Sequence, residues 1–148
     1  MEKKHRHLGA YGIYIKDGKI LLVDKCGGPY DGKLDLPGGS IEFCERPNEA
    51  LIREFKEEVG IDITEYELLD VDSVNVIWNY NDMIIDVHHI GVFYKIINYN
   101  NEIKKVIEID NQNDDSKGAD FYEISKLKRD ELSAIVILEL EKLGYKIN

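Results

Sequence analysis

Three glutamates lie close together in one short stretch of the chain and could bind a metal ion. Glu54, Glu57 and Glu58 stand at positions i, i+3 and i+4, so a helix would bring them to one face, one turn apart. Carboxylates crowded in this way repel one another and raise each other's pKa values. A cation among them relieves the repulsion, and clustered oxygen ligands suit a hard ion such as Mg²⁺ or Mn²⁺. We therefore predict a divalent metal site at these glutamates.

A helix that begins near Pro47 and ends before Gly60 would position the three glutamates. Proline suits the first turn, where its missing N–H costs nothing, and glycine suits the residue just past the end. At roughly 100° per residue, the apolar side chains fall on an arc away from the glutamates. These side chains are Leu51, Ile52, Phe55 and Val59. Glu-rich helix faces are also common in solvent, so the E-x-x-E-E cluster alone does not establish a metal site.

The residues around the glutamates complete a longer motif, G-x5-E-x7-R-E-hydrophobic-x-E-E-x-G-hydrophobic. Every specified position is met, by Gly39, Glu45, Arg53, Glu54, Phe55, Glu57, Glu58, Gly60 and Ile61. Chance does not readily produce so many specified residues at the correct spacing. A solvent-exposed helix face is therefore no longer the leading interpretation of the glutamates. The motif resembles the Nudix box of the Nudix hydrolase superfamily, the MutT-like proteins. Phe55 is the one position that departs from the preferred residue type, because the family more often has an aliphatic residue there.

The resemblance implies a fold and a reaction. Nudix domains are α/β/α sandwiches with a mixed β-sheet, which implies a single Nudix hydrolase domain over residues 1–148. The family hydrolyses a nucleoside diphosphate linked to another group, with water attacking phosphorus. The cofactor implied here is Mg²⁺, with Mn²⁺ as the other candidate. The metal ligands that the resemblance gives are the backbone carbonyl of Gly39 and the side chains of Glu54, Glu57 and Glu58.

Arg53 and Glu45 complete the expected catalytic set, in which Arg53 orients Glu45 and the other carboxylates. In the family the general base is the first glutamate of the R-E pair or an acidic residue in a later loop. Here the candidates are Glu54 and, in the later part of the chain, Glu108, Asp114 and Asp115. The sequence does not choose between them.

The rest of the chain predicts strands and one further helix. Asp17-Gly18 is a hairpin signal between strand-like runs at 8–15 and 19–24. The other predicted elements are a loop at 25–33, a short strand at 40–43, a long hairpin of 66–78 and 84–97 around a turn at 79–82, strands at 103–109 and 119–124 with a polar loop at 111–118 between them, and a closing helix at 129–143. By pattern alone this is an α+β fold with a mixed sheet between helices.

Composition limits the partners. The chain has 148 residues, 43% of them hydrophobic, and a formal net charge of −10. The negative charge disfavours binding to extended nucleic acid, whereas bound divalent ions reverse the local field for a small anionic substrate. Cys26 and Cys44 form no metal-binding spacing or disulfide framework, which favours a reduced, cytoplasmic setting. Cys44 stands where the family frequently has glycine, and we expect it to be a small buried side chain. No apolar run is long enough to cross a bilayer.

Aromatic and basic residues are the candidates for contact with the substrate. Trp78 and Tyr80 lie in or beside a predicted turn, and Tyr30 and Tyr11 are further candidates for base stacking. Lys25 and Lys33 flank the glycine-rich loop ahead of the box and could meet phosphate. Ordinary strand packing or solvation remains the alternative for each of them. His88 and His89 are adjacent in a predicted strand, so they should point to opposite faces and not share a metal. His5 and His7 are expected on a mobile N-terminus.

Substrate identity stays open at this point. ADP-ribose-cleaving relatives tend to carry a proline some fifteen positions past the box, and this chain has none after Pro47. Leu34 stands where many relatives have tryptophan. A nucleotide-binding regulatory module and an RNA 5′-end pyrophosphohydrolase are the alternative functions. The intact box disfavours the regulatory module, and the acidic net charge disfavours the RNA pyrophosphohydrolase. Homodimers are frequent in the family, which implies a homodimer here.

Overall fold

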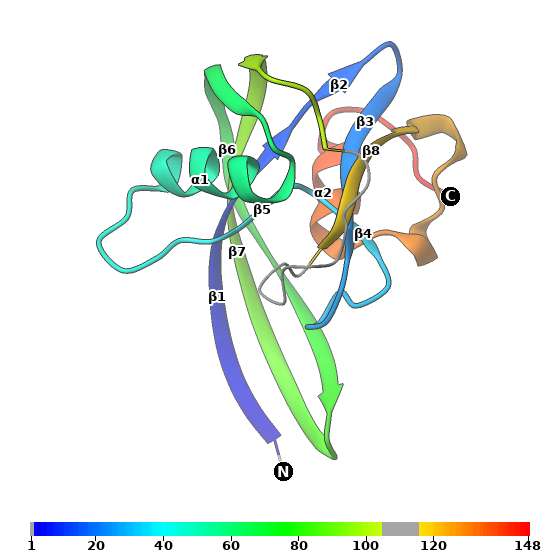
Figure 1. Cartoon of the computed structure of the whole chain (residues 1–148). Coiled ribbons are helices and arrows are strands. Elements are labelled where there is room, and N and C mark those ends of the chain that lie inside the picture. Colours follow the sequence, from blue (N-terminus) through cyan, green and yellow to red (C-terminus); the bar gives the residue numbers. More distant parts are fainter. Residues whose placement is uncertain (1, 105–115) are drawn as a thin grey trace.

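The computed structural model describes residues 2–104 and 116–148, which form two β-sheets flanked by helices (Figure 1). The strands are β1 (Glu2–Ile13), β2 (Ile15–Lys16), β3 (Lys19–Lys25), β4 (Leu34–Asp35), β5 (Gly38–Ser40), β6 (Asp62–Tyr80), β7 (Met83–Asn100) and β8 (Ser116–Glu123). The helices are α1 (Pro47–Glu58) and α2 (Ala134–Lys142), with short 3₁₀ turns η1 (Ile124–Lys126) and η2 (Arg129–Glu131) before α2. The predicted α+β class is confirmed.

The strands divide between two sheets rather than forming one. The first has the order β5-β1-β7-β6, and β1 pairs with β7 in parallel while the other pairs are antiparallel. The second contains β2, β3 and β4, with β8 paired to β3, and is antiparallel throughout. The first sheet is therefore the mixed one. Its parallel pairing joins the start of the chain to a strand that ends at Asn100.

Helices cover the strands on both sides. Neighbouring residues of β3 point to opposite sides, Leu21 toward the cluster that contains α1 and Leu22 toward the cluster that contains α2. The α1 side chains in the core are Ala50, Leu51, Phe55 and Val59, and those of α2 are Ile135, Val136 and Leu140. Burying a side chain as large as Leu51 or Phe55 contributes roughly 1.5–3 kcal/mol. These contacts produce the expected α/β/α sandwich and hold α1 in place.

A glycine on β1 lets α1 approach the sheet. A Cβ at Gly12 would lie 2.5 Å from the ring of Phe55, closer than any side chain can come. Phe55, where the family more often has an aliphatic residue, therefore fits because β1 leaves space for its ring. Ile52, in contrast, was expected on the packing face but is partly exposed.

Two turns form where the sequence predicts them. Asp17 and Gly18 both have positive φ, 54° and 75°, which is the type I′ geometry that matches the twist of a hairpin. Asn81 and Asp82, with φ of 48° and 64°, turn the chain between β6 and β7. This second hairpin is longer than the predicted runs of 66–78 and 84–97.

Several element boundaries differ from the sequence-based expectation. The closing helix begins at Ala134 rather than 129, because Ser133 donates its backbone N–H to Leu34 and its hydroxyl to Asp35, which holds it in extended conformation. The strand predicted at 40–43 lies earlier, at β5, and shares only Ser40 with the prediction. The predicted strand at 103–109 and loop at 111–118 fall largely on residues 105–115, outside the described residues, and residues 116–118 belong to β8. No helix of the described residues is long and apolar enough to cross a membrane.

Cys44 is exposed rather than buried, and the expectation of a small buried filler is wrong. Its φ is 67°, in the left-handed region that favours glycine. Glycine, which the resemblance gives for many relatives at this position, adopts this φ without strain.

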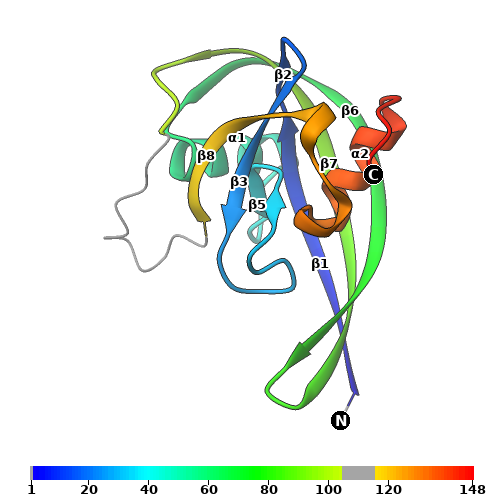
Figure 2. The ribbon, with the colours of Figure 1, turned by 90° about the vertical axis from the view of Figure 1, so that its right-hand side faces the viewer.

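The N-terminal strand and the β6–β7 hairpin extend together beyond the body of the molecule (Figures 1 and 2). Residues 2–6, 76–80 and 83–87 form this projection, which we call the arm. Its pairing corrects the expectation of a mobile N-terminus, because His5 and His7 lie within β1 and pair with Val87 and His89.

Candidate active site

The motif helix α1 begins and ends as predicted. Pro47 is its first residue, and the Glu49 carboxylate accepts the backbone N–H of Arg46 at 2.9 Å, which satisfies a donor at the N-terminus. At the other end Gly60, with φ of 82°, donates its N–H to the Phe55 carbonyl at 2.9 Å. These contacts satisfy backbone groups at both ends of α1, and the packing of its apolar side chains sets the direction of its glutamates.

Two glycines bring the backbone of β5 against the glutamates of α1. The Gly38 N–H donates to Glu58 Oε1 at 3.0 Å, and a Cβ at Gly38 would clash with the Ala10 carbonyl at 2.1 Å. At Gly39 a Cβ would lie 2.8 Å from the Glu54 carboxyl carbon. Only glycine therefore allows this backbone to run beside Glu54, which is where the resemblance places a carbonyl ligand.

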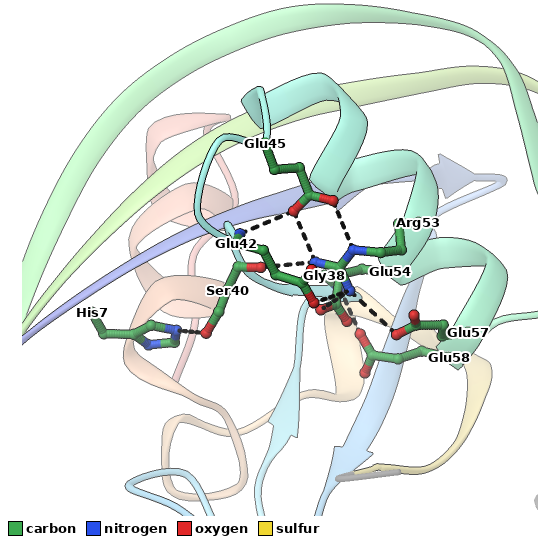
Figure 3. Close-up of polar contacts among 9 residues, drawn as sticks. All are labelled: His7, Gly38, Ser40, Glu42, Glu45, Arg53, Glu54, Glu57 and Glu58. Atoms are coloured by element: carbon green, nitrogen blue, oxygen red, sulfur yellow. Dashed lines mark hydrogen bonds and ion pairs between the residues drawn. The ribbon is translucent and has the colours of Figure 1, made fainter. Parts of the chain in front are cut away.

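Arg53 connects the helix to the preceding loop (Figure 3). Its Nε and Nη2 donate to the two oxygens of Glu45 at 2.8 and 3.0 Å. Nη2 also donates to the Ser40 carbonyl at 3.0 Å, and Nη1 reaches Glu54 at 3.0 Å and Glu57 at 3.4 Å. The predicted contact between Arg53 and Glu45 is present, and it lowers the pKa of Glu45 through these hydrogen bonds.

The three proposed ligand glutamates of α1 differ in exposure. Glu57 is exposed, Glu54 is half-buried, and Glu58 is only 2% exposed. Burial raises the pKa of Glu54, and the hydrogen bond and charge of Arg53 oppose that rise. These three carboxylates and Gly39 line one cavity, and carboxylate and carbonyl oxygens are the ligand type that suits a hard divalent ion.

The cavity beside the glutamates has a volume of about 350 Å³. Glu54, Glu57 and Glu58 of α1 and Gly39 and Ser40 of β5 line it. The remaining lining comes from β1 and β7, through His7, Tyr11, Val87 and His89, and from the segment between the end of β3 and β4, through Lys25, Cys26, Gly27, Gly28, Pro29, Tyr30 and Asp35. Of the predicted substrate contacts, Tyr30, Lys25 and Tyr11 therefore lie beside the glutamates.

The structure does not bring Trp78, Tyr80 or Lys33 to this cavity. Trp78 and Tyr80 pack against each other, with ring centroids 4.8 Å apart, in the part of β6 that belongs to the arm. They lie there because the β6–β7 hairpin continues past the predicted strand ends. Lys33 donates to the Asp130 carbonyl at 2.9 Å instead. The later general-base candidates Glu108, Asp114 and Asp115 lie outside the described residues.

Two histidines that were not predicted as site residues line the cavity. His89 is 1% exposed, and the His7 ring stacks on it with centroids 4.5 Å apart. His7 Nε2 also lies 2.9 Å from the Ser40 hydroxyl, which links the stack to the residue after Gly39 (Figure 3). His88, as predicted, points to the other face, where Arg6 Nε donates to it at 3.3 Å. Only the β1–β7 pairing brings His7 to His89, so no local sequence signal marks them.

A second carboxylate cluster lies away from this cavity, between β6 and α2. Oxygens of Asp70, Asp72 and Glu139 lie within 4.8 Å of one another. The Lys142 ammonium contacts Asp70, lies 2.8 Å from Asp72 and lies 3.5 Å from Glu139. A lysine therefore already supplies the positive charge that this cluster needs.

Comparison with known proteins agrees with the fold and the motif. The sequence model of the NUDIX domain matches residues 3–139, so the chain belongs to the Nudix family. A MutT NUDIX hydrolase from Burkholderia pseudomallei superposes with a TM-score of 0.73 at 25% identity, covering 95% of this chain and 99% of that one.

Two curated relatives differ in the substrates that they are named for. An ADP-ribose pyrophosphatase of Methanocaldococcus jannaschii is 30% identical over 84% of this chain and 66% of its own. An 8-oxo-dGTP diphosphatase of Proteus vulgaris is 38% identical over 47% of this chain and 63% of its own. The chain thus spans just under two thirds of the length of these relatives.

Proposed function

We propose that this protein hydrolyses a nucleoside diphosphate linked to another group, with water attacking phosphorus and Mg²⁺ as the cofactor. Mn²⁺ is the other candidate ion. One observation carries the proposal: Glu54, Glu57, Glu58 and Gly39 line the same cavity as the rings of Tyr11, Tyr30, His7 and His89. Phosphate groups belong beside the glutamates and the nucleoside beside the aromatic rings. The domain assigned to this activity covers residues 1–148.

The proposed metal ligands are the Gly39 carbonyl and the carboxylates of Glu54, Glu57 and Glu58. An ion held by these residues would neutralise phosphate charge and lower the pKa of a water molecule. Arg53 and Glu45 act as positioning residues, because their paired hydrogen bonds hold Arg53 where it also reaches Glu54 and Glu57. Among the general-base candidates Glu54 is the one in the described residues, and it lines the cavity.

The proposed substrate contacts within the cavity are Tyr30, Lys25 and Tyr11. Lys25 supplies positive charge at a cavity whose other ionised groups are mainly carboxylates. Trp78, Tyr80 and Lys33 are not proposed as contacts of the same bound molecule, because they lie outside this cavity. The relatives' names point to two substrate types, ADP-ribose and an oxidised nucleoside triphosphate, and the missing downstream proline favours the second.

A panel of substrates tests the proposal. Purified protein is incubated with ADP-ribose, 8-oxo-dGTP, the common nucleoside triphosphates and a 5′-triphosphorylated RNA, each with Mg²⁺ or Mn²⁺, and released phosphate, pyrophosphate and monophosphate are measured. We expect hydrolysis of at least one small nucleotide. Glu57→Gln should lower its rate by orders of magnitude, and Glu67→Gln, an exposed glutamate on β6, is the matched control.

Two results would contradict the proposal. Binding without hydrolysis across the panel favours the regulatory module. A preference for the RNA over mononucleotides in competition favours the RNA 5′-end pyrophosphohydrolase.

We further propose a cytoplasmic location and a homodimer. The exposed thiols of Cys26 and Cys44 form no disulfide, which supports a reducing compartment. The arm supports the dimer, because Ile77, Tyr80 and Ile84 are exposed there and β6 is an edge strand of its sheet. Long apolar edge strands are surfaces that proteins normally cover.

A further inference from the structure

Both ring nitrogens of His89 are engaged by tyrosine hydroxyls. Tyr11 Oη lies 2.6 Å from Nε2, and Tyr30 Oη lies 2.8 Å from Nδ1. All three side chains are buried and all three line the cavity. Tyr11 comes from β1, Tyr30 from the loop after β3 and His89 from β7, so the histidine joins three separate segments at one wall of the cavity.

The surroundings of His89 favour the neutral form of its ring. Burial, the charge of His7 and the charge of Lys25 lower the pKa of His89 to about 3. A neutral imidazole carries one N–H donor and one lone-pair acceptor. Burial and nearby negative groups also raise the pKa values of Tyr11 and Tyr30, so both phenols keep their protons.

Counting hydrogens then leaves one donor over. The two phenols and the neutral ring carry three polar hydrogens, and their two mutual contacts use two of them. The tyrosine facing the bare ring nitrogen donates to it, and the other accepts from the ring N–H and keeps its own O–H. The heavy atoms do not fix which tyrosine this is, because both tautomers satisfy the same distances. Among the described residues, no hydrogen bond joins either hydroxyl to any partner other than His89.

We propose that His89 is a positioning residue that directs one tyrosine O–H, from Tyr11 or Tyr30, into the cavity as a donor to an acceptor atom of the nucleobase. This inference rests on the proposed function only in taking a nucleotide as the ligand. A buried donor without an acceptor is costly, and a carbonyl oxygen or ring nitrogen of a base supplies one. The donor then distinguishes bases by whether they present an acceptor at that point.

The surroundings hold this wall at a fixed position relative to the glutamates. Gly9 leaves room for the Tyr11 hydroxyl, since a Cβ there would lie 2.4 Å from it. The His7 ring stacks on His89 and contacts Ser40 next to the proposed carbonyl ligand Gly39. The hydroxyl donor and the carboxylates therefore belong to one connected structure, so a base acceptor and a phosphate can be engaged together.

Equilibrium binding tests the inference without requiring hydrolysis. Affinities of AMP, CMP, GMP and UMP are measured by calorimetry with Mg²⁺ for the wild type, Tyr11→Phe, Tyr30→Phe and His89→Phe. Tyr122→Phe, a tyrosine outside the cavity, is the matched control. We expect one of the two cavity tyrosine variants to bind the preferred nucleotide about 3- to 10-fold more weakly, the range of one neutral hydrogen bond. His89→Phe should show a similar loss, while ribose 5-phosphate, which lacks the base, should bind all variants alike.

Several outcomes would overturn the inference. They are wild-type affinity in all three cavity variants, an equal loss of affinity for ribose 5-phosphate, or no binding of any of the four nucleotides to the wild type. If His89→Phe does not fold, the two tyrosine variants still decide. Nitrogen NMR of His89 gives an independent readout: one protonated and one bare ring nitrogen at neutral pH support the inference. Two protonated nitrogens would leave both hydroxyls as free donors and overturn the assignment of one directed O–H. Hydrolysis in the substrate panel with unchanged binding here would remove this inference and leave the proposed function standing.

Discussion

Arg53 holds Glu45 through two hydrogen bonds, from Nε to Oε2 at 2.8 Å and from Nη2 to Oε1 at 3.0 Å. The same guanidinium reaches the Ser40 carbonyl and the carboxylates of Glu54 and Glu57. The planar fork of arginine allows this, whereas the point charge of a lysine does not. Loop, strand and helix are thereby tied together at one side chain.

Arg53→Lys should therefore lower kcat while preserving the fold. We expect a loss of about 10- to 100-fold, the usual effect of removing a residue that orients metal ligands. The measurement is steady-state kinetics on the substrate found in the panel, together with thermal unfolding. Arg129→Lys is the matched control, because Arg129 pairs with Glu141 on the surface. Equal activities of the two variants would show that Arg53 does not position the site.

The pKa of Glu139 predicts a pH dependence of stability. Burial, the hydrogen bond with Asp70 and the charge of Asp70 raise the pKa of Glu139 from 4.5 to about 8. Between these values the folded state holds a proton that the unfolded state has lost, so stability falls as pH rises through this window. Lys142 acts in the opposite direction and limits the effect.

Glu139→Gln should remove this dependence, because the amide stays neutral. Relative to the wild type, we expect the free energy of unfolding of the variant to increase by at least about 1 kcal/mol as the pH rises from 5 to 8. Urea unfolding measures this difference. Glu141→Gln, an exposed neighbour on α2, controls for the loss of one carboxylate. A wild-type profile that rises over this window would contradict the assignment.

Cys44 predicts a substitution that stabilises the protein. Its φ of 67° costs a non-glycine residue roughly 1–2 kcal/mol, while glycine adds about 0.5–1 kcal/mol of unfolded-state entropy. Cys44→Gly should therefore raise the free energy of unfolding by about 0.5 kcal/mol, and the β-branched Cys44→Val should lower it by about 1 kcal/mol.

Urea unfolding under reducing conditions measures both changes. Cys26→Gly is the control, because Cys26 is exposed but does not have a positive φ, so glycine should not stabilise there. If Cys44→Val unfolds at a higher free energy than Cys44→Gly, the backbone explanation is refuted.

The arm predicts how the proposed homodimer is disrupted. Ile77 is 62% exposed on the edge strand β6, so Ile77→Lys should shift the protein to monomer if the arm forms the interface. Sedimentation over a range of protein concentrations measures this. Leu143→Lys, at the exposed end of α2, is the control. A wild type that stays monomeric at every concentration would remove the dimer proposal.

Local patterns in the sequence were sufficient for the motif helix and for both hairpin turns. Pro47 and Gly60 mark the ends of α1, and Asp17-Gly18 marks a turn, because each acts through its own backbone geometry. The contact between Arg53 and Glu45 could also be anticipated, since the motif places both around one short helix.

The cavity wall could not be predicted in the same way. His7 meets His89 only through parallel pairing of two strands far apart in the chain, and no local spacing encodes that register. Trp78 and Tyr80 were expected beside the box because a turn was predicted at 79–82. Their position depends instead on the direction in which the β6–β7 hairpin extends. Ser133 shows a related limit: its contacts with Leu34 and Asp35, distant in sequence, decide where α2 starts.

The parallel pairing of β1 with β7 has a consequence for biosynthesis. Arg6 and His88, which face each other across that pairing, are separated by 82 residues. The first strand, β5 and the whole motif helix therefore leave the ribosome before the strand that completes their sheet exists. Contacts of such long range close slowly and leave strand edges exposed in the meantime. We infer that the glutamates of α1 come into register with the aromatic wall only late in folding, and that the nascent N-terminal half is the part that most depends on protection from aggregation.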